Sequence, residues 1–277
     1  MRGPDILART MSVATTRGGS DRPWQYHSRS DNHSKVACWT VLFDLMLECD
    51  VFREHVAAGR IGFGINFVMV GPINKTLDLV VTRIPATRKA TPRIAFADLV
   101  EQYGIQLDAD DRAMLDQLPA MAGESRKHDA SEVAIALEAK ACMTEHSKSL
   151  PRLHAEILAT GYLARRAQPH CITASYSMVN ASSTFVTPSG KGRVNRHTQP
   201  EDARRVVEML GKAIPLKADS ADVGYDVVGA IVVNCCNDGS PVTVLDTAPA
   251  PVKQKDHLHY ERMISSLCGQ YRARFGR

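Results

Sequence analysis

Hydrophobic residues recur at three- and four-residue steps in the segment 34–57. They fall at Val36, Trp39, Leu42, Phe43, Met46 and Leu47. This spacing predicts an amphipathic helix that begins at Ser34 and stops at Gly59. Asp44 and Glu48 are four residues apart, so they share one face of the predicted helix.

The pattern then changes to that of β-strands. Segment 62–83, GFGINFVMVGPINKTLDLVVTR, contains two runs rich in β-branched and aromatic residues on either side of a Gly-Pro turn, which predicts a hairpin with Asp78 in its second strand. Apolar runs predict further strands at 132–142 and 171–180. Between them, Pro151 and an apolar stripe predict a helix.

The remaining chain divides by composition. Residues 1–32 are rich in Gly, Ser, Arg and Asp without periodicity, which predicts a poorly ordered arm before a single domain at 33–277. Residues 84–130 are predicted to be an insertion with helices near 96–103 and 110–118. After 180 we expect the basic loop TPSGKGRVNRHTQP, a helix near 201–213, strands at 227–233 and 241–245, and a basic helix at 256–274.

This order of elements predicts an α/β (α+β) fold with a central mixed β-sheet flanked by helices. The formal charge of +4 permits a polyanionic partner. Seven cysteines, an odd number without regular spacing, favour reduced thiols in a cytoplasmic protein and do not suggest a zinc site. No apolar run reaches the roughly 18 residues that span a bilayer, so no membrane association is expected.

The strand predicted at 132–142 carries two charges inside its apolar run. A strand has a period of two, so Glu138 and Lys140 point to the same face. Glu138-Ala139-Lys140 is the only acid-x-Lys triplet in the chain. If the strand that contains Asp78 is a neighbour, the two carboxylates and the lysine converge. Carboxylates hold Mg²⁺, and a nearby lysine can orient or help deprotonate water and offset charge on a phosphate.

These residues and the order of elements resemble the PD-(D/E)xK nuclease superfamily, which includes type II restriction endonucleases. The resemblance covers about 34–180 without the insertion, and leaves 181–277 as a C-terminal elaboration. It implies that Asp78 and Glu138 bind one or two Mg²⁺ ions and that Lys140 is the catalytic lysine. Glu48, with Asp44 as second choice, would be the additional acid on the first helix. The family's proline before the aspartate is Leu77 here.

A nuclease of this type would act on double-stranded DNA, as a homodimer if it cuts both strands of a two-fold site. Its DNA contacts are expected in the basic loop, at Lys191, Arg193, Arg196 and His197. His146 and Lys148 follow the motif in a polar turn, where His146 could also contact phosphate.

Alternatives remain open from the sequence. The chain could be a catalytically inactive nucleic-acid-binding or assembly protein on the same fold. Glu138 and Lys140 could be the solvated face of an edge strand, and the basic loop an ordinary surface loop. An unrelated α/β metabolic enzyme gains no support, because the chain has no glycine-rich phosphate loop of the GxxxxGK[ST] or GxGxxG type.

Overall fold

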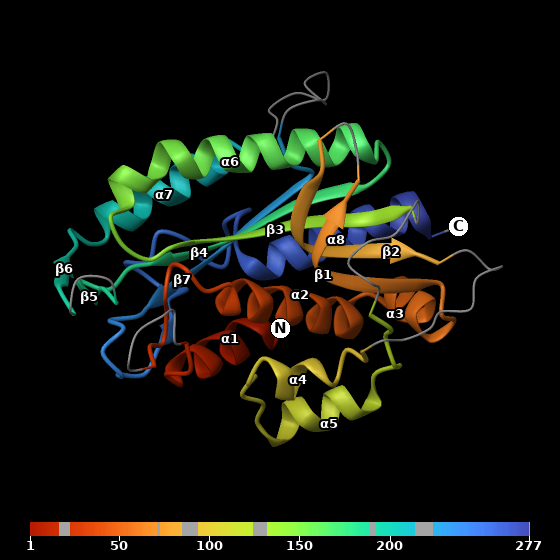
Figure 1. The fold of residues 1–277 in the computed structure, drawn as a ribbon, viewed down its shortest axis with the longest axis horizontal. Helices are drawn as coiled ribbons and strands as arrows, with labels where there is room; N and C mark the ends of the chain where they lie inside the picture. The colour runs from red at the N-terminus through yellow and green to blue at the C-terminus, as the bar shows by residue number, and fades with distance from the viewer. Residues whose placement is uncertain are drawn as a thin grey trace.

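A six-stranded mixed sheet forms the centre of the computed structural model (Figure 1). The structure describes residues 1–16, 23–70, 73–84, 94–123, 132–188, 192–213 and 224–276. The strand order is β1-β2-β3-β4-β7-β8. Strands β1, β2 and β3 pair antiparallel, β3, β4 and β7 pair parallel, and β8 returns antiparallel. The strands are β1 (Ile61–Met69), β2 (Lys75–Arg83), β3 (Val133–Cys142), β4 (Ile172–Asn180), β7 (Val227–Asn234) and β8 (Thr243–Val244).

Helices cover both faces of this sheet, as Figure 1 shows. On one face lie α1 (Gly3–Ser12), α2 (Asn32–Glu48), α3 (Asp50–Ala57) and α8 (Tyr260–Phe275); on the other lie α6 (His146–Ala167) and α7 (Glu201–Gly211). The short helices α4 (Leu99–Gln102) and α5 (Ala109–Gln117) belong to the predicted insertion. The prediction of an α/β fold with a central mixed sheet between helices is therefore confirmed. Among the described residues, no helix has both the length and the apolar character to cross a bilayer.

Strand β3 is an interior strand, because β2 pairs with one of its edges and β4 with the other. Its side chains from Val133 to Ala139 are buried on both faces, and Glu138 is only 3% exposed. The alternative that Glu138 and Lys140 form the solvated face of an edge strand is therefore wrong for Glu138. Helix α6 covers the face of β3 that carries Glu138 and Lys140, for which the sequence alone did not predict a covering element.

The N-terminal segment is not a loose arm where the structure describes its helix. Ile6 and Leu7 in α1 are fully buried in the main core. The backbone amides of Arg2 and Gly3 donate to the Asp44 carboxylate at 2.9 and 2.8 Å, which anchors the start of α1 on α2. The prediction of disorder is wrong for 3–12, because a ten-residue helix gains its stability from tertiary contacts and not from its own propensity.

The helix predicted at 34–57 is two helices. The chain bends at Cys49, whose backbone is extended, and α3 begins at the next residue. Cys49 forms a disulfide with Cys268 of α8, so the expectation of reduced thiols is wrong for this pair. Gly59 ends the segment as predicted, with a φ of 64° that favours glycine.

The strands and helices predicted after the hairpin are present, most of them with small boundary shifts. The prediction of a polar turn at His146 and Lys148 is wrong, because α6 begins at His146 and Pro151 lies inside the helix. The segment predicted as a basic loop contains a strand, β6 (Val194–Arg196), which pairs antiparallel with β5 (Thr184–Val186) just before the loop. Only three residues pair on each side, which is shorter than the runs that a period-two pattern can identify.

Candidate active site

Strands β2 and β3 separate at the position of the predicted carboxylates. Their backbone pairing reaches Leu79 and Leu137 and does not continue to the next pair of residues, Asp78 and Glu138. There a side chain takes over, since Asp78 Oδ2 accepts a hydrogen bond from the Ala139 amide at 2.8 Å. The structure thus brings Asp78 beside the Glu-x-Lys strand, as the period-two argument predicted.

Glu138 has one engaged and one unengaged carboxylate oxygen. Its Oε1 lies 2.7 Å from Lys140 Nζ and 3.5 Å from Lys75 Nζ. Its Oε2 is buried and has no hydrogen-bond partner among the described residues. A buried carboxylate oxygen without a partner is costly, and such atoms commonly have a functional explanation.

The surroundings of Asp78 disfavour the ionised form of its carboxyl group. Burial, followed by the nearby Glu138 carboxylate, raises the pKa of Asp78 to about 6, although the Ala139 amide and the two lysines act in the opposite direction. Two carboxylates held this close favour a bound cation, because a cation relieves both the desolvation and the mutual repulsion.

Lys140 is a positively charged group between two acids. Burial by itself would lower the pKa of Lys140, but the Glu138 carboxylate, with Asp78 and Glu156, raises it above the ordinary value. Its Nζ is 3.4 Å from Glu156 of α6. Lys140 therefore carries its proton at neutral pH, which suits a role in offsetting phosphate charge more than a role as a base.

Two residues of this cluster were missed from the sequence. Lys75 is three positions before Asp78, and period two would put it on the opposite face of a regular strand. Glu156 is on α6, and only the packing of that helix against β3 brings it to Lys140. The predicted apolar stripe of α6 could have identified the face that meets the sheet, but not the residue that meets Lys140.

The residues present fit a Mg²⁺ ion held by few protein ligands. Among the described residues, no group of three or more His, Cys, Asp or Glu side chains is placed to hold a metal. Asp78 and the free oxygen of Glu138 nevertheless supply two carboxylates. Mg²⁺ in phosphoryl-transfer enzymes is often bound through one or two carboxylates, with water and substrate phosphate completing its coordination.

Glu48 and Asp44, the acids predicted as additional metal ligands, are on α2 and do not belong to this site. In the β1–β2 pair the register places Asn66 level with Asp78. Asn66 donates a hydrogen bond to Asp31, at the N-terminal end of α2, at 2.8 Å. Glu48 is exposed at the other end of that helix, about 25 Å away along its axis at 1.5 Å per residue. Asp44 is already occupied by the amides at the start of α1. The expected extra ligand on the helix is therefore absent from the described part of the site.

The predicted DNA-binding segment lies close to the end of the Glu-x-Lys strand. Arg193 and Arg196 are exposed on the β5–β6 hairpin, and His197 is half-buried; Lys191 lies outside the described residues. Thr144, four residues after Lys140, accepts a hydrogen bond from Asn195 of the hairpin at 2.8 Å. The structure therefore places the basic hairpin beside β3, which the sequence could not show.

A groove connects the end of β3 to this hairpin. It has a volume of about 580 Å³ and is lined by residues of β3 after Lys140, the first turns of α6 and the hairpin. Exposed cations stand along it at Lys148, Arg152 and Arg193. Arg152 was not selected from the sequence, because a single arginine on an amphipathic helix has no distinguishing pattern.

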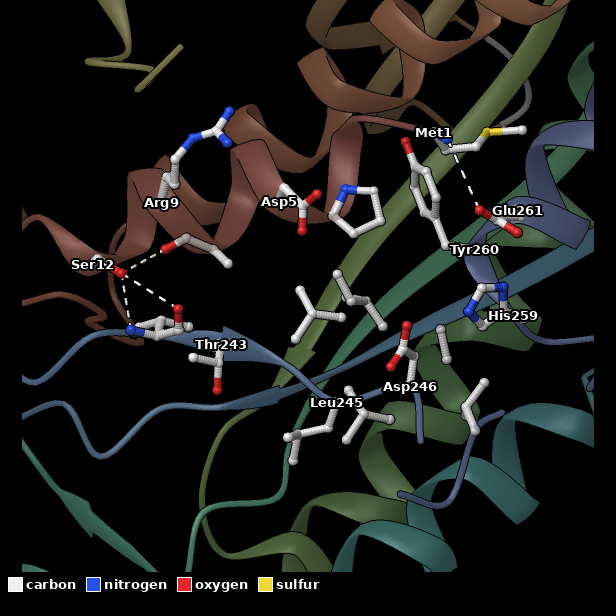
Figure 2. Close-up of a pocket in the computed structure, with 18 of the residues that line it drawn as sticks. Met1, Asp5, Arg9, Ser12, Thr243, Leu245, Asp246, His259, Tyr260 and Glu261 are labelled. Carbon is white, nitrogen blue, oxygen red and sulfur yellow. Dashed lines mark hydrogen bonds and ion pairs between the residues drawn. The ribbon is translucent and has the colours of Figure 1, made fainter. Parts of the chain in front are cut away.

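A larger pocket, of about 670 Å³, lies away from these residues. Figure 2 shows it between α1, the β7–β8 edge and the start of α8. Its floor is apolar, and the acids Asp5, Asp246 and Glu261 stand around it with His259. Glu261 is in contact with the amino group of Met1 at 3.9 Å. Neither Asp78, Glu138 nor Lys140 lines this pocket, so size alone does not identify the candidate site.

Comparison with known proteins gives no relative. No protein-family model, no curated protein and no solved structure matches the chain. The function is therefore inferred from the geometry of the site and from the similarity of Asp78, Glu138 and Lys140 to the nuclease motif.

Proposed function

We propose that this protein is a Mg²⁺-dependent endonuclease that hydrolyses phosphodiester bonds of double-stranded DNA, as a sequence-specific enzyme of the type II restriction class. One observation carries the proposal: Asp78, Glu138 and Lys140 meet where β2 and β3 separate, and Glu138 keeps a buried oxygen without a partner. Three charged groups concentrated at a gap in a sheet are expensive for stability, and a catalytic role explains their presence.

The two carboxylates would hold the metal. Bound Mg²⁺ would polarise the scissile phosphate and lower the pKa of a coordinated water. Asp78 is fixed for this purpose by the Ala139 amide, and Glu138 is fixed by Lys140 through its other oxygen. Both side chains are therefore oriented before substrate binds, which reduces the reorganisation needed during the reaction.

Lys140 would act on the phosphate and the attacking water. Its raised pKa keeps the ammonium charged, so it can donate hydrogen bonds to a phosphate oxygen and stabilise negative charge in the transition state. Lys75 adds a second positive charge on the Glu138 carboxylate. Glu156 holds Lys140 from the side of α6 and so restricts where the ammonium can point.

The groove and the hairpin would bind the DNA backbone. Lys148, Arg152 and Arg193 line the groove that starts just after Lys140, and exposed cations are the groups that contact phosphates in protein–DNA interfaces. Double-strand cleavage at a two-fold site requires two active sites, so we propose a homodimer. A cytoplasmic location remains an expectation from the sequence.

Plasmid cleavage tests the proposal. Supercoiled plasmid incubated with the purified protein and Mg²⁺ should become linear, whereas the same mixture with EDTA should leave it intact. Mapping the ends then gives the recognition site and the cut position. Intact plasmid with Mg²⁺ or Mn²⁺, over a range of DNA sequences, would contradict an active endonuclease.

A catalytically inactive nucleic-acid-binding protein on the same fold is the alternative. It would bind DNA equally well with and without metal and would cut in neither case. The presence of all three residues favours the active enzyme, because Glu138 contacts Lys140 and both affect the ionisation of Asp78.

A further inference from the structure

A second polar pocket lies between the start of α6 and the β5–β6 hairpin. Its volume is about 310 Å³. It is lined by the loop after β3, the first turn of α6, the hairpin and one acid of α7: Thr144, Glu145, His146, Ser147, Lys148, Arg193, Val194, Asn195, Arg196, His197 and Asp202. Among these residues the Lys and Arg side chains outnumber the carboxylates, and Glu145 is already paired with Lys148 at 2.9 Å.

The pocket includes the N-terminal end of a long helix. Helix α6 has 22 residues, and the side chain of its N-cap Glu145 makes no capping hydrogen bond to the backbone amides of the first turn. The first amides of a helix have no partner within it and carry a partial positive charge, so this end attracts anions.

His146 supplies an independent sign of a ligand. It is 2% exposed, and its Nε2 lies 2.8 Å from the Asn180 carbonyl oxygen. A carbonyl only accepts, so Nε2 carries the hydrogen, and the other ring nitrogen, Nδ1, is buried without a partner. When the ring is protonated, Nδ1 becomes a donor in a pocket that also presents amides, hydroxyls, three cations and the two acids Glu145 and Asp202.

The neighbouring His197 does not have a free nitrogen of this kind. Its Nδ1 is 2.9 Å from the Ser182 carbonyl oxygen, and its Nε2 is 3.2 Å from the Thr144 hydroxyl. The two imidazole rings meet edge to face, with centroids 4.8 Å apart. His197 therefore fixes the position of His146, while His146 keeps one hydrogen-bonding position to spare.

We propose that this pocket is a phosphate subsite that binds a phosphodiester group next to the scissile one. A tetrahedral anion would take hydrogen bonds from the first amides of α6 and the protonated His146, with Arg193 and Arg196 at its open side. The nucleic-acid origin of that phosphate rests on the proposed function. The loop that leads from Lys140 into α6 forms one wall, so the two phosphate positions lie on one continuous segment of chain.

Binding at this subsite should take up a proton. Burial lowers the pKa of His146, so at neutral pH the ring is mostly neutral, and a bound phosphate favours the protonated form. Of the groups around the ring, Glu145 and Asp202 favour protonation; Lys148, Arg193, Arg196 and His197 oppose it. Phosphate affinity is therefore expected to fall as the pH rises from the lowered pKa of the free ring to the higher pKa of the phosphate-bound ring.

Histidine side-chain NMR on the full chain tests the subsite without any cleavage assay. Titration with inorganic phosphate should shift the imidazole signals of His146 and His197 to saturation, and a short DNA duplex in EDTA should displace the phosphate. The exposed His170 serves as the internal control and should not shift. An apparent phosphate affinity that the duplex does not weaken would overturn the assignment to a phosphodiester.

Two variants test the same point by DNA affinity in EDTA. His146→Asn removes the ionisable ring, so a donor at this position can no longer be charged, and duplex binding should weaken about tenfold, the loss expected for one charge-assisted hydrogen bond. Ser147→Glu introduces a residue type that is favourable in the first turn of a helix, so folding should be preserved. Its negative charge should repel phosphate. His170→Asn and Ser265→Glu, both exposed and outside the pocket, are the matched controls.

The outcomes separate the subsite from the proposed function. Wild-type duplex affinity in Ser147→Glu, together with no saturable shift of His146, would overturn the subsite even if plasmid is cleaved. A saturable shift of His146 by phosphate, with an apparent affinity that the duplex weakens, would support the subsite, and uncut plasmid in the same preparation would contradict the endonuclease.

Discussion

Two carboxylates of this protein, the buried Glu138 and the half-buried Asp226, differ in how they are satisfied. Asp226 accepts hydrogen bonds from the Thr173 amide and hydroxyl through one oxygen and binds Arg274 and Arg165 through the other. Glu138 engages lysines through one oxygen only, and its second oxygen has no partner among the described residues.

This difference separates an acid that supports the fold from an acid that can bind a ligand. Burial alone would raise the pKa of Asp226, but the Thr173 amide and the Arg274 guanidinium hold it below its ordinary value. Near Glu138 the effect is the reverse, because that carboxylate contributes to the raised pKa of Asp78. A fully partnered carboxylate lowers the energy of the folded state, whereas an under-partnered pair has coordination capacity to offer a cation.

The largest expected effect is on catalysis by the under-partnered pair. Glu138→Ala and Asp78→Ala should each abolish plasmid cleavage, because loss of a carboxylate ligand removes the metal and several kcal/mol of transition-state stabilisation. Folding and DNA binding in EDTA should be largely retained. Glu132→Ala, which removes an exposed acid just before β3, is the matched control. Near-normal turnover in either purified variant would remove the basis for the assignment.

Lys140 distinguishes a catalytic group from a structural ion pair. Lys140→Met keeps the aliphatic stem packed against β3 and loses the charge, so single-turnover cleavage should fall by at least about two orders of magnitude. The melting temperature should fall, because the buried Glu138 carboxylate loses its nearest cation, but the protein should remain folded. Lys253→Met, at an exposed position, should cleave normally. A folded Lys140→Met protein with the wild-type cleavage rate would mean that the Glu-x-Lys triplet is a coincidence.

The comparison also predicts opposite stability changes in metal-free protein at pH 7. Asp226→Asn should cost about 2 kcal/mol, because two partly buried arginines lose their charged partner. Asp78→Asn should add about 1–3 kcal/mol, because the wild-type carboxyl ionises less readily in the folded chain than in the unfolded one.

The pH dependence follows from the direction of each shift. The folded pKa of Asp226 is lowered, so its contribution is present above the unfolded pKa and is lost as the pH falls through the folded value. The folded pKa of Asp78 is raised to about 6, so its destabilising effect grows as the pH rises from about 4 to 6. Urea unfolding at pH 4 and 7 measures both, and equal signs for the two Asn variants at pH 7 would contradict the comparison.

The smallest expected effect concerns the hairpin beside the site. Replacing both Arg193 and Arg196 with Gln should weaken DNA binding and reduce the slope of log K against log salt by up to about two units. Arg112→Gln with Arg262→Gln, exposed on α5 and α8, tests for a general effect of net charge. An unchanged slope in the hairpin variant would return this segment to the class of ordinary surface loops.

The sequence by itself determined the elements and the local chemistry. Periods of 2 and about 3.6 in the hydrophobic pattern were enough to predict the hairpin, the Glu-x-Lys strand, the helix after it and the later strands. The period of two also put Glu138 and Lys140 on one face, since that relation depends only on the backbone of a strand. The contact between their side chains follows directly from it.

Only the tertiary structure decided what surrounds those residues. The strand order makes β3 an interior strand, and α6 covers the face of β3 that carries Glu138. Glu138 is therefore buried, although alternating charges in a sequence also occur on solvated strand faces. Tertiary packing brings Lys75 and Glu156 to the candidate site and leaves Glu48 far from it. It also attaches α1 to α2 through backbone amides that donate to Asp44. These relations join residues far apart in the chain, and their energy comes from burial and charge pairing that exist only once the sheet is assembled, so no local pattern contains them.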